Sequence, residues 1–130
     1  MKRIRVGVAV IIHNGKILIS KRHADLHQGG KWEFPGGKIE AGETESDAII
    51  RELREELSIT ATKLEPLLEL SHDYSDKQVS LYVWTVTDFT GTPVGVEGQP
   101  VKWIPVADLE RYQFPDANYP IVKKLLAEFL

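Results

Sequence analysis

The sequence predicts an α+β fold, an α/β/α sandwich in which a mixed β-sheet lies between two helices. Three observations predict it: several short apolar segments are separated by turn residues, one amphipathic helical pattern interrupts them, and a second such pattern closes the chain. The length of 130 residues fits one domain, for which about 100 to 200 residues is usual. We therefore expect residues 1–130 to form a single domain.

The composition excludes several classes of protein. The formal net charge of −3 argues against direct DNA binding, because duplex-DNA binders usually carry a basic surplus. The absence of cysteine rules out disulfide scaffolds and thiolate nucleophiles. The longest apolar run, residues 8–12, is far shorter than the roughly 20 residues that span a membrane. We expect a cytoplasmic monomer without a membrane partner.

The first 30 residues predict a β-hairpin and a loop. Residues 6–12 form a nearly continuous apolar, β-branched run, and Asn14-Gly15 is a tight-turn signal. Residues 16–20 resume the strand pattern. The polar stretch 22–30 ends in two glycines, which indicates a loop before the aromatic segment that begins at Trp32.

The strongest helical pattern covers residues 44–57. Thr44 is a candidate N-cap, and Asp47 occupies the position that Glu takes in a capping box. The apolar residues recur at helical spacing: Ile50, Leu53 and Leu57. This pattern predicts one helix whose apolar stripe packs on the sheet.

The remaining elements are predicted from alternation and from turn residues. After Pro66, residues 67–74 and 79–88 indicate two strands, and residues 101–104 a third. Residues 119–130 predict a final helix, since Pro120 is tolerated in a first helical turn. Its apolar stripe comprises Ile121, Leu125 and Phe129.

Charge is distributed unevenly along the chain. Residues 1–39 carry a net charge of +6, whereas residues 40–56 carry −5. Glu52, Glu55 and Glu56 share one helix face, and like charges at this spacing cost about 0.2–0.5 kcal/mol per pair. A solvated acidic face is one interpretation. A divalent cation is the other, because Mg²⁺ and Mn²⁺ prefer oxygen ligands and leave positions for phosphate oxygens.

Residues 37–59 resemble the signature of the Nudix hydrolase family, GX5EX7REUXEEXGU, in which U is a bulky aliphatic residue. The matching positions are Gly37, Glu43, Arg51, Glu52, Leu53, Glu55, Glu56 and Ile59. Ser58 replaces the glycine that follows the helix, where a left-handed conformation is common. A non-glycine residue costs on the order of 1 kcal/mol there, so we expect altered local geometry without loss of catalysis.

Blocks outside this signature resemble the branch of the family that hydrolyses 8-oxo-dGTP. They include Lys21-Arg22, His27, residues 32–40, residues 97–100, Trp103, Phe114-Pro115, Ala117-Asn118 and Pro120. The resemblance implies a Mg²⁺-dependent enzyme, with Mn²⁺ as a substitute. It implies hydrolysis of 8-oxo-dGTP to 8-oxo-dGMP and pyrophosphate, which removes an oxidised nucleotide before replication.

The same resemblance implies the metal ligands and the catalytic residues. The implied metal ligands are the Gly36 carbonyl, Glu52, Glu55, Glu56 and Glu97. Either Glu52 or Glu97 would orient or deprotonate the attacking water, and Glu52 is favoured. Arg51 would orient the carboxylates of the signature, which agrees with its i, i+4 spacing to Glu55. Glu43 would support the preceding loop.

The resemblance also implies which residues contact the nucleotide: Arg22, His27, Glu33, Phe34, Pro35, Gly36, Lys38 and Asn118. Asn118 is the candidate for reading the base, because an amide can form paired hydrogen bonds with a purine edge. Asn118 could instead cap the last helix. Arg22 and His27 could be solvated surface residues, and Lys38 could only screen nearby carboxylates.

Two other functions remain open at this point. One keeps the chemistry and changes the substrate, for example to a pyrimidine nucleoside triphosphate. The other is a nucleotide sensor of the same family that does not hydrolyse its ligand. The three signature glutamates, whose loss is the usual mark of such sensors, are all present.

Overall fold

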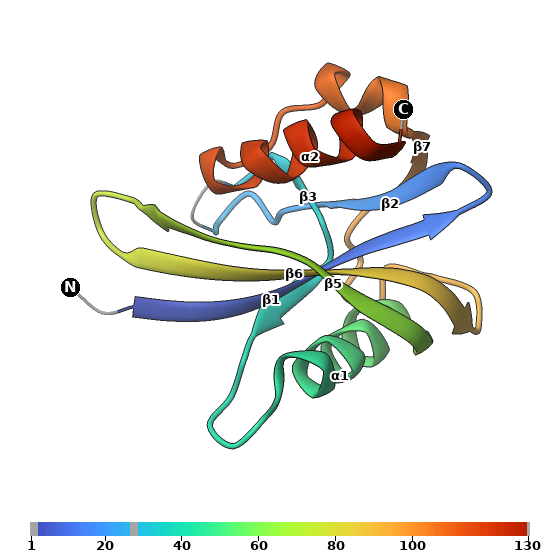
Figure 1. The fold of residues 1–130 in the computed structure, drawn as a ribbon, viewed down its shortest axis with the longest axis horizontal. Coiled ribbons are helices and arrows are strands. Elements are labelled where there is room, and N and C mark those ends of the chain that lie inside the picture. The colour runs from blue at the N-terminus through green and yellow to red at the C-terminus, as the bar shows by residue number, and fades with distance from the viewer. Residues whose placement is uncertain (1–2, 27–28, 130) are drawn as a thin grey trace.

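A computed structural model describes residues 3–26 and 29–129 of the chain. It places a mixed β-sheet between helix α1 (Glu45–Leu57) on one side and helix α2 (Tyr119–Phe129) on the other (Figure 1). The predicted α/β/α sandwich is therefore confirmed. Neither helix in this part of the chain is long and apolar enough to cross a membrane.

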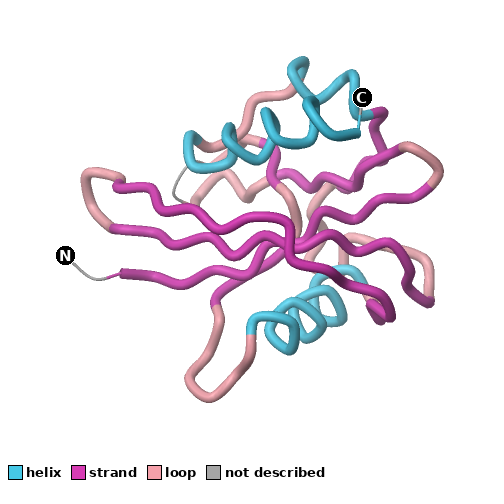
Figure 2. Tube along the Cα trace, in the orientation of Figure 1, coloured by secondary structure: helices cyan, strands magenta, loops and turns pink. Residues whose placement is uncertain are grey.

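The described residues contain seven strands, and Figure 2 shows how they cross the middle of the molecule. The strands are β1 (Arg3–His13), β2 (Lys16–Lys21), β3 (Trp32–Glu33), β4 (Gly36–Lys38), β5 (Thr60–Asp73), β6 (Gln78–Thr90) and β7 (Val101–Pro105). The order is β3-β2-β1-β6-β5, with β4 paired to β1 and β7 to β2. β1 and β6 run parallel and the other pairs are antiparallel, so the sheet is mixed as predicted.

Strand β1 contributes to a hydrophobic core on each face of the sheet. Val8 and Val10 pack in the cluster that contains the buried residues of α2, whereas Ala9 and Ile11 pack in the cluster that contains those of α1. Successive side chains of a strand point to opposite faces. A continuous apolar run is therefore the pattern required of a central strand that is covered on both sides.

The predicted helices form, but their buried stripes differ in detail. The Thr44 hydroxyl accepts a hydrogen bond from the Asp47 N–H, as predicted for the cap. Ile49, rather than Ile50, is buried with Leu53 and Leu57, because spacing by four residues keeps a side chain on the same face. Phe129 was expected in the core but is 43% exposed at the end of α2.

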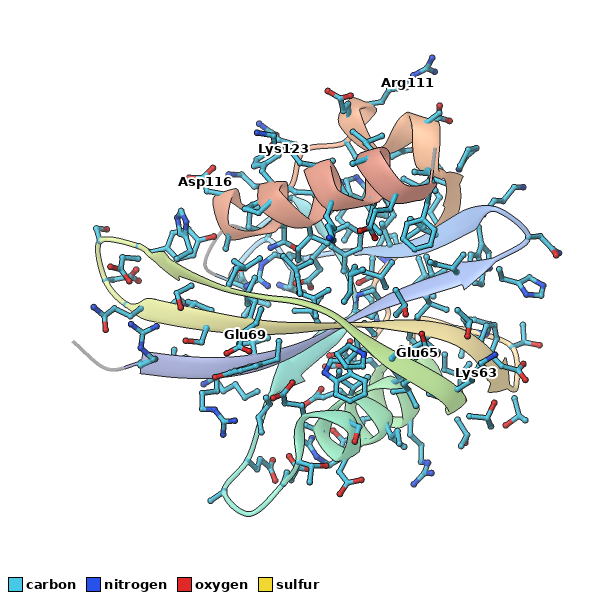
Figure 3. The ribbon with its side chains drawn as sticks, in the orientation of Figure 1. Lys63, Glu65, Glu69, Arg111, Asp116 and Lys123 are labelled. Atoms are coloured by element: carbon cyan, nitrogen blue, oxygen red, sulfur yellow. The ribbon has the colours of Figure 1, made fainter. Side chains whose placement is uncertain are left out.

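Strand β5 begins at Thr60, seven residues before the predicted start after Pro66. Proline is tolerated because β5 is an edge strand, where a missing N–H need not break a pair, and the register shifts beside Pro66. Lys63, Glu65 and Glu69 are exposed along this edge (Figure 3). Such charges discourage pairing with another chain.

Ser58 ends α1 in the left-handed conformation, with φ 59° and ψ 32°. Its N–H donates to the Arg54 carbonyl at 3.2 Å. The expectation of altered geometry is therefore wrong: Ser58 adopts the conformation for which glycine is preferred. The substitution changes the energy of the turn and leaves its shape intact.

The loop between β4 and α1 is fixed by Arg51. Its Nε and Nη2 donate to the two carboxylate oxygens of Glu43 at 2.8 and 2.9 Å, and Nη2 also donates to the Lys38 carbonyl. Glu43 accepts a further bond from the Glu40 N–H. These bonds lower the pKa of Glu43 to about 2, which confirms the expected support role of this residue.

We predict that Ser58→Gly stabilises the protein by about 0.5–1 kcal/mol, because glycine removes the cost of the left-handed backbone. The free energy of unfolding in urea measures the effect. Ser46→Gly, inside the right-handed helix α1, is the matched control and should be destabilising. An unchanged or lower stability of Ser58→Gly would contradict the prediction.

We predict that Glu43→Gln lowers stability at neutral pH and that this loss disappears in acid. The pKa of Glu43 lies below its unfolded value of 4.5, so its ionic contacts stabilise the fold above pH 4.5 and are lost as the pH falls towards 2. Urea unfolding of both proteins across this range tests it. Glu65→Gln, at an exposed position on β5, controls for the loss of one charge.

Candidate active site

The site forms where α1 approaches β1 and β4 at two glycines. A Cβ at Gly37 would lie 2.4 Å from the Glu52 Cδ, and a Cβ at Gly7 would lie 2.9 Å from the Ile49 Cγ1. Any larger residue at Gly37 would therefore occupy the space of the Glu52 carboxylate. The glycines allow the acidic face of α1 to lie directly on the backbone of β4.

Glu33, Glu52 and Glu56 form a partly buried carboxylate group beneath this contact. Burial, a hydrogen bond with Glu52 and the negative charges of Glu52 and Glu33 raise the pKa of Glu56 to about 9, although the Gly36 backbone also hydrogen-bonds to it. Burial likewise raises the pKa of Glu33, against the effect of Arg22, which donates to it at 2.6 Å. Glu56 is therefore protonated at neutral pH unless a cation replaces the proton.

Arg51 holds the other side of this group. Its Nη1 donates to Glu52 at 2.9 Å and to Glu55 at 3.4 Å. The hydrogen bonds with Glu43 and with Glu52 raise the pKa of Arg51. The Glu52 side chain is 15% exposed and that of Glu55 is 60% exposed. The structure thus brings Glu52 and Glu56 together, whereas Glu55 lies on the solvent side of the guanidinium.

The loop 94–99 carries Glu97 to the same region. The Val94 and Val96 N–H groups donate to the Leu57 and Glu56 carbonyls at 3.0 Å each. Glu97 and Glu56 line one open cleft with Lys21, Arg22 and His23. The cleft therefore has acidic residues on the side of α1 and basic residues from the end of β2.

A smaller cavity of about 220 Å³ adjoins this cleft. Six of the eight residues expected at the nucleotide line it: Arg22, Glu33, Phe34, Gly36, Lys38 and Asn118. Arg22 and Glu33 also line the larger cleft, so the two spaces share a wall. Val6, Val8 and Leu81 from β1 and β6 provide an apolar side of the cavity.

The other two predicted nucleotide residues are placed differently. Pro35 is buried, does not line the cavity, and its carbonyl accepts a hydrogen bond from the Ala9 N–H of β1. His27 lies outside the described residues. Asn118 belongs to a 3-10 turn (Asp116–Asn118) rather than to the extended backbone that is usual for an N-cap, and α2 begins at the next residue.

Sequence reasoning missed three residues of the site. Tyr74 and Lys77 line the small cavity, and the Tyr74 hydroxyl accepts a hydrogen bond from the Ala117 N–H at 2.9 Å. Gln99 contacts both Glu97 and Glu56. Tyr74 and Lys77 lie beside the turn between β5 and β6, and no sequence pattern indicates that this turn reaches Ala117. Gln99 belongs to the block 97–100, which resembles the family but to which the sequence analysis gave no role for Gln99.

The chemistry of the donor set fits a divalent cation. Among the described residues, no three His, Asp or Glu side chains are already arranged around one point as a cage. Mg²⁺ does not require one, because it usually binds one or two carboxylates together with water and phosphate oxygens. A Mg²⁺ site of this kind, without its cation, would bring two carboxylates close together and raise the pKa of one of them. Glu52 and Glu56 are close together, and the pKa of Glu56 is raised.

Comparison with known proteins agrees with this site. The family model described as NUDIX domain matches residues 7–124. The Escherichia coli K12 protein named 8-oxo-dGTP diphosphatase is 41% identical over 126 residues, which cover 96% of this chain and 98% of that protein. The E. coli K12 protein named CTP pyrophosphohydrolase is 39% identical, with 98% and 94% covered.

Solved structures show the same fold. A MutT structure from work on Aliivibrio salmonicida and Vibrio cholerae has a TM-score of 0.87 and 42% identity, and the match covers 98% of this chain and all of that one. The matched family model spans strands β2 to β7 and the whole of α1 with its acidic signature. The chain therefore belongs to the Nudix hydrolase family.

Proposed function

We propose that this protein is a Mg²⁺-dependent nucleoside triphosphate pyrophosphohydrolase that converts 8-oxo-dGTP to 8-oxo-dGMP and pyrophosphate. The proposal rests on one observation: the cavity lined by Asn118 and the cleft lined by Glu56 lie next to each other, because Arg22 and Glu33 line both. A base in the cavity would extend its phosphates into the cleft. The 41% identity to the E. coli 8-oxo-dGTP diphosphatase supports this substrate.

Glu52, Glu56 and the Gly36 carbonyl would hold the cation, with Glu55 as a further ligand, and Mn²⁺ could substitute for Mg²⁺. Glu97, which was also expected as a ligand, is assigned to the attacking water instead. When bound, the cation supplies charge neutralisation for the phosphates and the leaving pyrophosphate. Arg51 keeps the Glu52 carboxylate in place through its bond of 2.9 Å. Lys38 and Arg22, on the cavity wall, would contact phosphate or base.

Hydrolysis requires a water molecule in line with the P–O bond that breaks. The Glu52 carboxylate already interacts with both Arg51 and Glu56. Glu97 is exposed on the opposite loop of the cleft. These contacts favour Glu97 over Glu52 as the residue that orients the water and accepts its proton.

Asn118 would read the base. An oxidised guanine carries a proton on N7 beside the O6 acceptor, and an amide offers the acceptor and donor that match this edge. Phe34 forms a rigid wall, because it is 97% covered and stacks on Phe114 with ring centroids 5.1 Å apart. Undamaged guanine would leave the Asn118 carbonyl unpaired, and this is a source of strong selectivity.

A pyrimidine substrate is the second candidate, since the CTP pyrophosphohydrolase of E. coli is 39% identical over nearly the whole chain. We predict that, in a panel of oxidised and undamaged nucleoside triphosphates, kcat/KM is highest for 8-oxo-dGTP and requires Mg²⁺. Pyrophosphate is the expected co-product. Release of orthophosphate would contradict the proposed bond cleavage, and a preference for CTP would support the second candidate.

We predict that Glu56→Gln lowers Mg²⁺-dependent turnover by about 100-fold or more without unfolding the protein, because even the residues that support a metal ligand are worth about 10- to 100-fold. The pKa of about 9 means that Glu56 is neutral at pH 7 in the metal-free protein, and glutamine resembles that neutral form. Steady-state kinetics and thermal unfolding test both parts. A near-normal rate would remove Glu56 from the metal site.

We predict that Asn118→Ala reduces the preference for 8-oxo-dGTP over dGTP by about 10- to 100-fold, which corresponds to the loss of one or two hydrogen bonds. The kcat for dGTP should change little, because Asn118 lies in the cavity rather than in the acidic cleft. Comparison of kcat/KM for both nucleotides measures it. An unchanged preference would exclude base reading by Asn118.

A further inference from the structure

The loop 94–99 is held to the end of α1 by a side chain to which the proposed mechanism gives no role. The Gln99 Oε1 accepts a hydrogen bond from the Glu97 N–H at 2.9 Å, and the Gln99 Nε2 donates to the Glu56 carbonyl at 3.1 Å. One amide thus connects the backbones of two glutamates that are 41 residues apart in the sequence. Both glutamates line the same cleft, together with Gln99 itself.

Only an amide of this length satisfies both contacts. Glu97 supplies a donor and Glu56 supplies an acceptor, so the side chain between them must accept at one end and donate at the other. A glutamate would place a carboxylate against the Glu56 carbonyl. An asparagine is one methylene shorter and could not span the same two groups.

The loop is built to keep Gln99 in this place. A Cβ at Gly95 would lie 2.0 Å from the Gln99 carbonyl oxygen, so the chain folds back on itself more closely than any other residue allows. The Gly98 N–H donates to the Gly95 carbonyl at 2.9 Å, and Gly98 has a φ of 81°. The last carbonyls of a helix lack partners within it, and this loop supplies them for Glu56 and Leu57.

We infer that Gln99 is a positioning residue, which fixes the backbone of Glu97 opposite Glu56 before substrate binds. The inference depends on the proposed role of Glu97 in orienting the water. A reaction is slower when its general base must become ordered in every turnover. It is not slowed in this way when the backbone of the general base is already held by a hydrogen bond. Gln99 therefore contributes to kcat through Glu97 and does not contact the nucleotide base.

The test replaces Gln99 with methionine, which has similar length and removes both hydrogen bonds. Gln99→Met should lower kcat about tenfold with little change in KM, as expected when a catalytic group is less well positioned. In a Glu97→Gln background the same replacement should have almost no further effect on kcat. Gln113→Met, at an exposed position away from the loop, is the matched control and should behave as the unchanged protein.

A second readout does not depend on turnover or on metal. Amide hydrogen exchange of the metal-free protein should be faster at Val96 and Glu97 in Gln99→Met, and unchanged at the buried strand amides of β1. Gln99→Leu also removes both hydrogen bonds, so it should give the same pattern if the methionine variant folds poorly. All variants are compared on the triphosphate that the unchanged protein hydrolyses fastest.

The outcomes separate the inference from the proposed function. Normal kcat and normal exchange in Gln99→Met would overturn the positioning role. An equal loss of kcat with and without Glu97 would also overturn it, because Gln99 would then act by another route. A normal rate in Glu97→Gln would refute the assignment of Glu97 and with it the inference, whereas a preference for another triphosphate would refute only the substrate assignment.

Discussion

The close contact of α1 with β1 and β4 is the constraint on which the rest of the site depends. Glycine at positions 7 and 37 lets the helix lie against the strand backbone, where Ile49 fills the core and Glu52 reaches the sheet. A side chain at position 37 would displace that carboxylate. Gly37 is thus a packing requirement that lets the acidic helix lie close to strand β4, which also contains Gly36.

This contact concentrates negative charge where burial makes it expensive. Glu56 lies in the last turn of α1, where the helix dipole also disfavours an anion, and its neighbours Glu33 and Glu52 raise its pKa further. Arg22 and Arg51 compensate on the two outer sides, through bonds of 2.6 and 2.9 Å. Such a group is suited to exchange a proton for a cation, and Nudix hydrolases depend on divalent metals in general.

The ion pair of Arg22 with Glu33 also divides the site into two spaces. Arg22 and Glu33 separate a mainly apolar cavity, formed by the sheet, Phe34 and the turn of Asn118, from the charged cleft beside Glu56. Tyr74 completes this cavity, because its hydroxyl accepts a hydrogen bond from the Ala117 N–H beside Asn118. A substrate with an uncharged base and a charged tail matches this division better than one whose charge is distributed along its length.

Much of this could be predicted from the sequence, because local patterns determine local structure. The hairpin turn at Asn14-Gly15, the cap at Thr44 and the acidic face of α1 all follow from residue type and spacing, and the structure contains each of them. The strand start before Pro66 was missed, since only the edge position of β5 makes proline acceptable there. The short strand β4 was missed because its pairing with β1 is a long-range contact.

The sequence by itself determined the family, the two covering helices and the set of ionisable residues, since these depend on periodicity and on a contiguous signature. Only the tertiary structure decided which of those residues act together. It brought Glu33 close to Glu56 and left Glu55 near solvent, and it connected Gln99 to both Glu97 and Glu56. The reason is physical: proximity between segments 40 residues apart is fixed by packing on the sheet, and no local pattern encodes it.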